Sequence, residues 1–180
     1  MTTATHDAPA RLGEQLAARI RTLFARSLHI RTLDTGSCAA CESEIRLLGA
    51  PHYDLTRLGF FFTPAPRHAD LLMVTGPAVR AMDPAVAKTY QAMPEPRLVV
   101  AVGGCALGGV YRPDEFVHGS VDAVLPVDVY IPGCPPSPLA LLQGLLVAVD
   151  RLAERVSALS FVAESFVAGS LVADGGEADR

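Results

Sequence analysis

The stretch "RLVVAVGGCALGG", residues 97–109, joins an apolar strand to a cysteine. Its residues 98–102 are all apolar, and two adjacent glycines follow them before Cys105. A strand without alternating polar residues is typical of a parallel sheet that helices cover on both faces. The stretch therefore predicts an interior strand over 97–104, with Cys105 just past its carboxyl end.

The same type of segment recurs along the chain and alternates with helical patterns. Further strands are predicted over 28–34, 69–76 and 127–133, with a short extended piece at 59–63. Helices are predicted over 12–26, 41–49, 83–93 and 137–155. This alternation predicts an α/β domain of the doubly wound, flavodoxin-like type, with three layers and a parallel sheet.

Two of these helices begin with recognisable cap residues. Asp83 is expected to be an N-cap, because Pro84 follows it and proline suits the first helical position. Ser137 followed by Pro138 repeats the signal at the start of the last helix. Both are expected to accept a hydrogen bond from a free backbone N–H of the first turn.

The chain divides into three expected parts. Residues 1–27 are predicted to hold a tail and an amphipathic helix, residues 28–156 the flavodoxin-like domain, and residues 157–180 a C-terminal tail. The amphipathic helix either packs on its own domain or lies on a partner or a membrane surface. The tail is either a docking arm or a disordered end.

The composition is that of a globular protein, since half of the 180 residues are hydrophobic and 19% are charged. The formal net charge is −4 and no run of five basic residues occurs, which argues against nucleic-acid binding. The N-terminal stretch lacks the apolar core of a signal peptide, and no apolar run reaches about 18 residues. We therefore expect a cytoplasmic protein without a membrane span.

The four cysteines share one position in the predicted fold, because each follows the carboxyl end of a strand. They are Cys38 and Cys41 after residues 28–34, Cys105 after 97–104 and Cys134 after 127–133. In open α/β sheets the ligand site is the crevice outside these strand ends. The four thiols are therefore expected to converge, and in the cytoplasm they favour metal binding or redox chemistry over disulfides.

Several chemistries suit four converging cysteines. Thiolates bind zinc or an iron–sulfur cluster. The spacing, one C-x-x-C pair followed by two widely separated single cysteines, excludes a zinc ribbon but leaves zinc in another geometry open. A redox dithiol would use Cys38 and Cys41 and leave Cys105 and Cys134 unexplained. A flavoprotein, which the fold alone would allow, would explain none of the four.

The residues around Cys105 and Cys134 favour a cluster. Four glycines surround Cys105 in "VGGCALGG", and glycine lets the backbone approach a bulky inorganic group closely. Their backbone N–H groups can point at sulfur. "PGCPPSP", residues 132–138, makes a rigid turn that aims the thiol of Cys134. An ordinary turn between a strand and a helix remains the alternative for the glycines.

Four motifs together resemble the family of the twenty-kilodalton subunit of complex I, which includes the small subunits of [NiFe] hydrogenases. They are "TGSCAACESEI", "PRHADLLMVTGP", "VVAVGGCALGGV" and "VDVYIPGCPPSP", and the resemblance runs from about residue 28 to residue 153. It implies a flavodoxin-like fold and one [4Fe–4S] cluster. It also implies that Cys38, Cys41, Cys105 and Cys134 are the ligands.

The first motif separates the branches of that family. Respiratory complex I subunits carry two adjacent cysteines there, whereas the C-x-x-C-x-x-E form resembles the small subunits of membrane-bound group 4 hydrogenases. These include the hydrogenase-4 and formate hydrogenlyase types. The pair Ala39-Ala40 differs from the Asn-Gly often found in that branch, which leaves a relative without hydrogenase activity open.

The resemblance implies an electron-relay subunit that is not catalytic alone. Electrons would pass between a ferredoxin-like iron–sulfur subunit and a large subunit, either that of a hydrogenase or one like the forty-nine-kilodalton subunit of complex I. The acceptor would be protons at a nickel–iron centre or a quinone at the subunit interface. Membrane-arm subunits would hold the protein on the cytoplasmic face of the inner membrane. The alternative is a non-redox zinc-binding interaction module that uses the four cysteines.

Charged residues near the cysteines are candidates for coupling protons to electrons. Glu44 lies three residues after Cys41, one helical turn away, and it matches a recurrent acid of the family. A solvated helix glutamate is the alternative. Arg67 and His68 precede a strand, at the end away from the cysteines, and are expected to contact partners. Glu42 is expected to be a first-turn charge.

Overall fold

The computed structural model describes residues 8–170, with side chains for residues 11–156. Its strands are β1 (Leu28–Asp34), β2 (Phe60–Phe62), β3 (Leu71–Thr75), β4 (Leu98–Val102) and β5 (Val129–Ile131). Its helices are α1 (Ala8–Phe24), α2 (Ala40–Leu47), α3 (Asp83–Ala92) and α4 (Pro138–Ser170). Three short 3-10 helices are η1 (Pro66–His68), η2 (Arg80–Met82) and η3 (Val121–Ala123).

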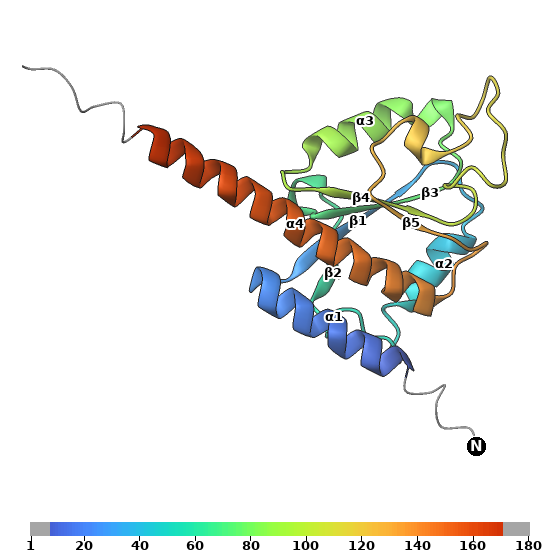
Figure 1. The fold of residues 1–180 in the computed structure, drawn as a ribbon. Helices are drawn as coiled ribbons and strands as arrows, with labels where there is room; N and C mark the ends of the chain where they lie inside the picture. The colour runs from blue at the N-terminus through green and yellow to red at the C-terminus, as the bar shows by residue number, and fades with distance from the viewer. Residues whose placement is uncertain (1–7, 171–180) are drawn as a thin grey trace, which may run out of the picture.

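The five strands form one parallel sheet in the order β2-β1-β3-β4-β5 (Figure 1). This is the flavodoxin order, with the chain reversing direction across the sheet at the β1–β3 pair. Every residue of β3 and β4 is buried, as their unbroken apolar sequences predict. The structure thus confirms the predicted fold class, including the three layers and the parallel sheet.

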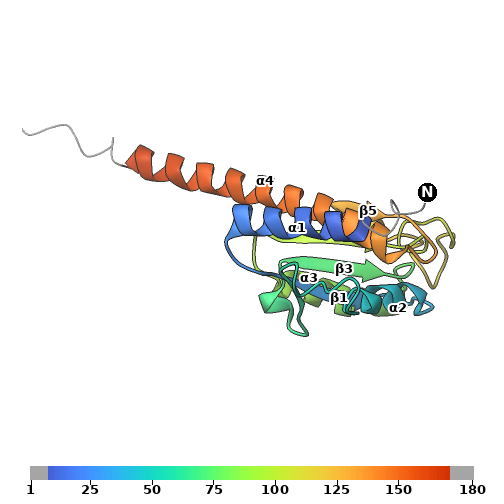
Figure 2. The same ribbon diagram turned by 90° about the horizontal axis from the view of Figure 1, so that it is seen from below.

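The two faces of the sheet are covered unequally. Buried residues of α1, α2 and α4 pack together on one face, whereas α3 and the loops around it cover the other (Figure 1). Figure 2 shows α1 and α4 side by side over the sheet. Leu16 and Ile20 of α1 are 0% and 2% exposed, so this helix packs on its own domain.

Of the two predicted helix caps, the structure confirms one and corrects the other. Ser137 is the expected cap of α4, since its Oγ accepts a hydrogen bond from the N–H of Ala140 at 3.3 Å. Asp83 is not an N-cap: η2 runs directly into α3, so Met82 takes the cap position. The Asp83 carboxylate instead lies 3.0 Å from Nε2 of His118.

The last helix is longer than predicted. It continues past residue 155 to Ser170, because residues 156–168 contain neither proline nor glycine to end it. In Figure 1 its second half projects away from the sheet. The division that assigns residues 157–180 to a tail stays a prediction, and residues 1–7 and 171–180 lie outside the described residues. No helix in the described part of the chain is long and apolar enough to span a membrane.

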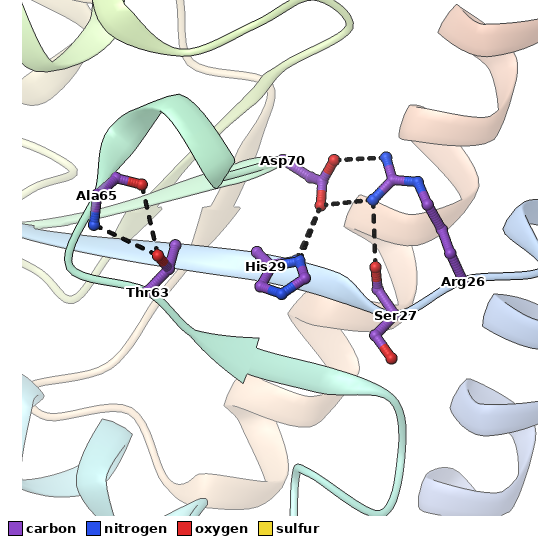
Figure 3. Close-up of polar contacts among 6 residues, drawn as sticks. All are labelled: Arg26, Ser27, His29, Thr63, Ala65 and Asp70. Carbon is purple, nitrogen blue, oxygen red and sulfur yellow. Dashed lines mark hydrogen bonds and ion pairs between the residues drawn. The ribbon is translucent and has the colours of Figure 1, made fainter.

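A polar cluster closes the amino end of the sheet (Figure 3). Asp70, just before β3, accepts hydrogen bonds from the backbone N–H of His29 at 2.9 Å and from Nη1 and Nη2 of Arg26 at 3.1 and 2.6 Å. The hydrogen bond and charge of Asp70 raise the pKa of Arg26. Arg67 and His68 belong to η1 at this same end, away from the cysteines, as expected.

Candidate functional site

The four cysteines lie at the carboxyl end of the sheet, three on loops and one in the first turn of a helix. Cys38 precedes α2, Cys41 lies in the first turn of α2, and Cys105 and Cys134 follow β4 and β5. All four are free thiols; Cys38 and Cys134 are exposed, and Cys41 and Cys105 are half-buried. The chain thus brings together residues from positions 38 to 134, as the strand-end argument predicts.

The thiols are close enough to influence one another electrostatically. Burial, together with the negative charges of Glu42, Cys105, Cys38 and Cys134, raises the pKa of the Cys41 thiol to about 11. Burial also raises the pKa of Cys105, and the negative charges of Cys134 and Cys38 contribute in the same direction. A cation that compensates the negative charge would favour ionisation of Cys41 and Cys105, as expected of metal ligands.

One of the two glycines before Cys105 leaves room at the sulfur of Cys41. Gly103 has φ +91°, and a Cβ built on it would lie 2.4 Å from the Cys41 Sγ. Its N–H donates to the carbonyl of Ile131 at 2.9 Å, and the N–H of Gly104 donates to Gly133 at 2.7 Å. These bonds tie the loops of Cys105 and Cys134 together, and any side chain at Gly103 would fill the space beside the thiol.

The turn at Cys134 is equally confined. Gly133 has φ +138°, and a Cβ there would lie 2.4 Å from the Cα of Pro136. Only glycine therefore fits before Cys134. This cradle and the four soft sulfur donors fit an iron–sulfur cluster in their chemistry. Among the described side chains, no group of three or more His, Cys, Asp or Glu residues is arranged to hold a single metal ion.

Hydrogen bonds fix the loop that carries Cys38. Asp34 Oδ1 accepts from the N–H groups of Gly36 and Ser37 at 2.9 and 2.7 Å, and Ser37 Oγ accepts from Ala39 N–H at 3.1 Å. Ser37 is therefore a turn residue. Ala39 has φ +67°, a left-handed conformation that asparagine adopts more readily than alanine. This gives a physical reason for the Asn-Gly pair often found between the first two cysteines in the hydrogenase branch that the chain resembles.

The two glutamates of α2 have different surroundings. Glu44 is half-buried on the helix. Glu42 does lie in the first turn, as predicted, but its Oε1 accepts a hydrogen bond from the hydroxyl of Thr75 at the end of β3. Glu42 Oε2 is buried, without a partner among the described residues. Sequence reasoning missed this contact, although Thr75 is the one polar residue of the strand "LLMVT".

An open, mainly apolar cavity of about 620 Å³ lies next to α2. Glu42, Ile45, Phe62, Thr75 and Met82 are among the residues that line it. It therefore adjoins the helix that carries Cys41.

Large apolar side chains are exposed on the segment after Cys105. Val110, Tyr111 and Phe116 are 52%, 48% and 66% exposed. Exposed apolar residues that gather in one segment are typical of a protein interface. The cysteine site is thus flanked by a surface suited to a partner subunit.

Comparisons with known proteins agree with this arrangement. The family model described as "NADH ubiquinone oxidoreductase, 20 Kd subunit" matches residues 38–148. The chain is 38% identical to the probable membrane-bound hydrogenase subunit mbhJ of Pyrococcus furiosus, over 79% of this chain and 86% of that protein. It is 37% identical to formate hydrogenlyase subunit 7 of Escherichia coli, over 83% of this chain but only 60% of that protein.

A solved structure is also similar. A chain of the membrane-bound sulfane sulfur reductase, an archaeal respiratory membrane complex, superposes with a TM-score of 0.62 at 31% identity. The match covers 78% of this chain and 77% of that one.

Proposed function

Because the chain belongs to the family described as the NADH ubiquinone oxidoreductase 20 Kd subunit, we propose that it carries one [4Fe–4S] cluster on Cys38, Cys41, Cys105 and Cys134. The cluster would relay electrons to or from the large subunit of a membrane-associated hydrogenase or a complex I-like assembly. The observation that supports this most is the position of the four cysteines at the carboxyl ends of the strands, where Gly103 leaves space beside the sulfur of Cys41.

The chain's own residues would hold and shield the site. When bound, the cluster supplies a centre that accepts and donates single electrons. Cys41 and Cys105 would anchor it on the half-buried side, and Cys38 and Cys134 would face outward. This placement suits electron exchange with a partner, since one side of the site stays accessible from the surface.

Partner subunits are part of the proposal. A large subunit, of the hydrogenase type or like the forty-nine-kilodalton subunit of complex I, would cover the surface of Val110, Tyr111 and Phe116 beside the site. A ferredoxin-like iron–sulfur subunit would exchange electrons with the relay. Membrane-arm subunits would hold the assembly on the cytoplasmic face of the inner membrane. Arg67 and His68, at the other end of the sheet, would contact partners there.

The preferred acceptor is the metal centre of a hydrogenase large subunit. The C-x-x-C-x-x-E motif and the hydrogenase names of two relatives support it. A quinone is the second candidate, which the apolar cavity beside α2 favours. Quinone-dependent oxidation of the reduced complex without formation of H₂ would select the quinone. Glu44, half-buried near Cys41, is the proposed residue for coupling protons to electron transfer.

Metal analysis provides the first test. Protein purified anaerobically is expected to be brown and to contain about four irons and four sulfides per chain, because four thiolates bind one such cluster. Colourless protein with one zinc and no sulfide, after anaerobic reconstitution, would select the four-cysteine zinc module instead.

Replacement of Cys105 by serine in the assembled complex tests the relay. Serine keeps the shape but is a much poorer ligand, because its hydroxyl hardly ionises at neutral pH and oxygen is harder than sulfur. Turnover with the physiological donor is expected to collapse, with association checked by co-purification. Normal turnover in a Cys105→Ser complex without its cluster would refute the relay.

Glu44→Gln should keep the cluster but slow turnover or change its pH dependence.

A further inference from the structure

The contact between Glu42 and Thr75 joins the helix of Cys41 to the central part of the sheet. Thr75 is the last residue of β3 and is 1% exposed. Its hydroxyl has two acceptors, Glu42 Oε1 and, at the longer distance of 3.4 Å, the carbonyl of Leu33. The contact therefore fixes the Glu42 side chain against a buried strand end, directly beside Cys41.

The second oxygen of this carboxylate makes the arrangement unusual. Glu42 Oε2 is buried and has no partner within the described part of the chain. Surface glutamates in a first helical turn are normally solvated at both oxygens, whereas this half-buried side chain has one oxygen bonded to Thr75 and the other shielded from solvent. A negative charge with one oxygen shielded from solvent is less screened than that of a fully exposed glutamate, and it acts on the neighbouring Cys41.

The geometry of α2 separates Glu42 from Glu44. Successive helix residues are rotated by about 100°, so these two side chains are about 200° apart. Ile45 and Leu48, which are 3% and 0% exposed, define the buried side of the helix. The two glutamates lie on opposite flanks of that side, and Glu42 is on the flank that meets β3.

We propose that Glu42, held in place by Thr75, sets a low reduction potential at the cysteine site; this rests on the [4Fe–4S] cluster proposed above. Reduction adds one electron to a site that already carries four thiolate charges. A partly shielded carboxylate beside Cys41 would oppose that added charge, so the reduced form would give up its electron more readily. Glu42 is thus a tuning residue, and Thr75 is the residue that positions it.

This role suits a relay that delivers electrons to the large subunit, one of the two directions proposed above. The electron would come from a reduced ferredoxin-like partner and go to an acceptor in the large subunit. A low-potential centre favours the second transfer when protons are the final acceptor. Loss of the Glu42 charge should slow that transfer.

The test compares variants in the intact complex under anaerobic conditions. Glu42→Gln keeps the shape and an acceptor for Thr75 but removes the charge. The midpoint potential, followed by EPR-monitored redox titration, is expected to rise by the equivalent of a tenfold change in the reduction equilibrium, about 59 mV for one electron. Thr75→Val should shift it in the same direction by less, because the carboxylate is no longer held.

Glu95→Gln is the matched control. It removes the same charge from a side chain that is 60% exposed and lies before β4, at the far end of the sheet. Its midpoint should equal that of the unmodified complex. A fully loaded Glu42→Gln complex with an unchanged midpoint would overturn the inference. If Glu42→Gln fails to load, an unchanged midpoint in Thr75→Val overturns it. Absence of iron and sulfide from the unmodified complex would instead refute the proposed function.

Discussion

Buried polar residues form hydrogen bonds that hold the chain together at the two ends of the sheet. Thr35, Asp70 and Thr75 are the buried polar or charged side chains in the described part of the chain. The hydroxyl of Thr35 donates to the carbonyl of Thr75 at 2.7 Å and accepts from the N–H of Ala78 at 3.1 Å, which orders the carboxyl end of the sheet near the cysteines. Asp70 acts at the opposite end, where it joins the segment after α1 to β1 and β3. The two ends are thus stabilised by separate polar contacts.

Asp70→Ala should therefore destabilise the fold without changing the site. It removes the acceptor of the His29 N–H and of the Arg26 guanidinium, and a partly buried donor without an acceptor costs about 1–3 kcal/mol. Anaerobic urea denaturation measures the loss. Asp150→Ala is the control, because its ion pair with Arg19 is 3.7 Å long and exposed, and such pairs contribute about 1 kcal/mol or less. Equal losses of unfolding free energy in both variants would contradict the stabilising role of Asp70.

At the scale of elements, the loops after the strands decide the shape of the site. Each of β1, β4 and β5 ends in a loop that carries at least one cysteine. Two adjacent glycines after β4 have different roles. Gly103 has a positive φ and faces the Cys41 sulfur, whereas Gly104 has ordinary space around its Cα, with the nearest atom 3.5 Å from a built Cβ.

Gly103→Ala should therefore prevent cluster binding, and Gly104→Ala should not. The new methyl of the first variant would lie 2.4 Å from the Cys41 Sγ and would force a strained backbone. Iron content per chain after anaerobic purification is expected to fall strongly in Gly103→Ala and to stay near the unmodified value in Gly104→Ala. Similar iron contents in the two variants would show that the cradle does not hold the cluster.

Across the whole molecule, the exposed apolar residues after Cys105 and the exposed cysteines lie on connected loops at one end of the sheet. The apolar composition of the chain, with half of its residues hydrophobic, fits a subunit that buries this surface in an assembly. We therefore expect the isolated subunit to be poorly soluble.

Val110→Ser should weaken association with the large subunit. Burial of a valine contributes about 1.5 kcal/mol or more, so removal of its apolar group should weaken binding about tenfold. Val147→Ser is a matched control, because Val110 and Val147 are 52% and 50% exposed but Val147 lies on α4. Co-purification at limiting concentration measures the difference. Equal retention of the large subunit by both variants would place the interface elsewhere.

The order and type of the elements follow from local sequence. Unbroken apolar segments such as residues 98–102 predict buried parallel strands, because burial on both faces leaves a local pattern. The same pattern placed Cys38, Cys41, Cys105 and Cys134 past strand ends, and the structure brings them together. The extension of α4 to Ser170 was missed, although it is also a local property, since only helix-breaking residues would have limited it.

Which charged residues meet depends on the packing of the elements and could not be predicted. Both Asp83 and Glu42 were assigned roles within their own helices, as cap and as first-turn charge. In the fold, Asp83 pairs with His118, and Glu42 contacts Thr75. These partners are 35 and 33 residues away in the chain. The pattern of α2 predicts which side of the helix is buried, but the neighbours on each flank depend on how Ile45 and Leu48 pack against the sheet.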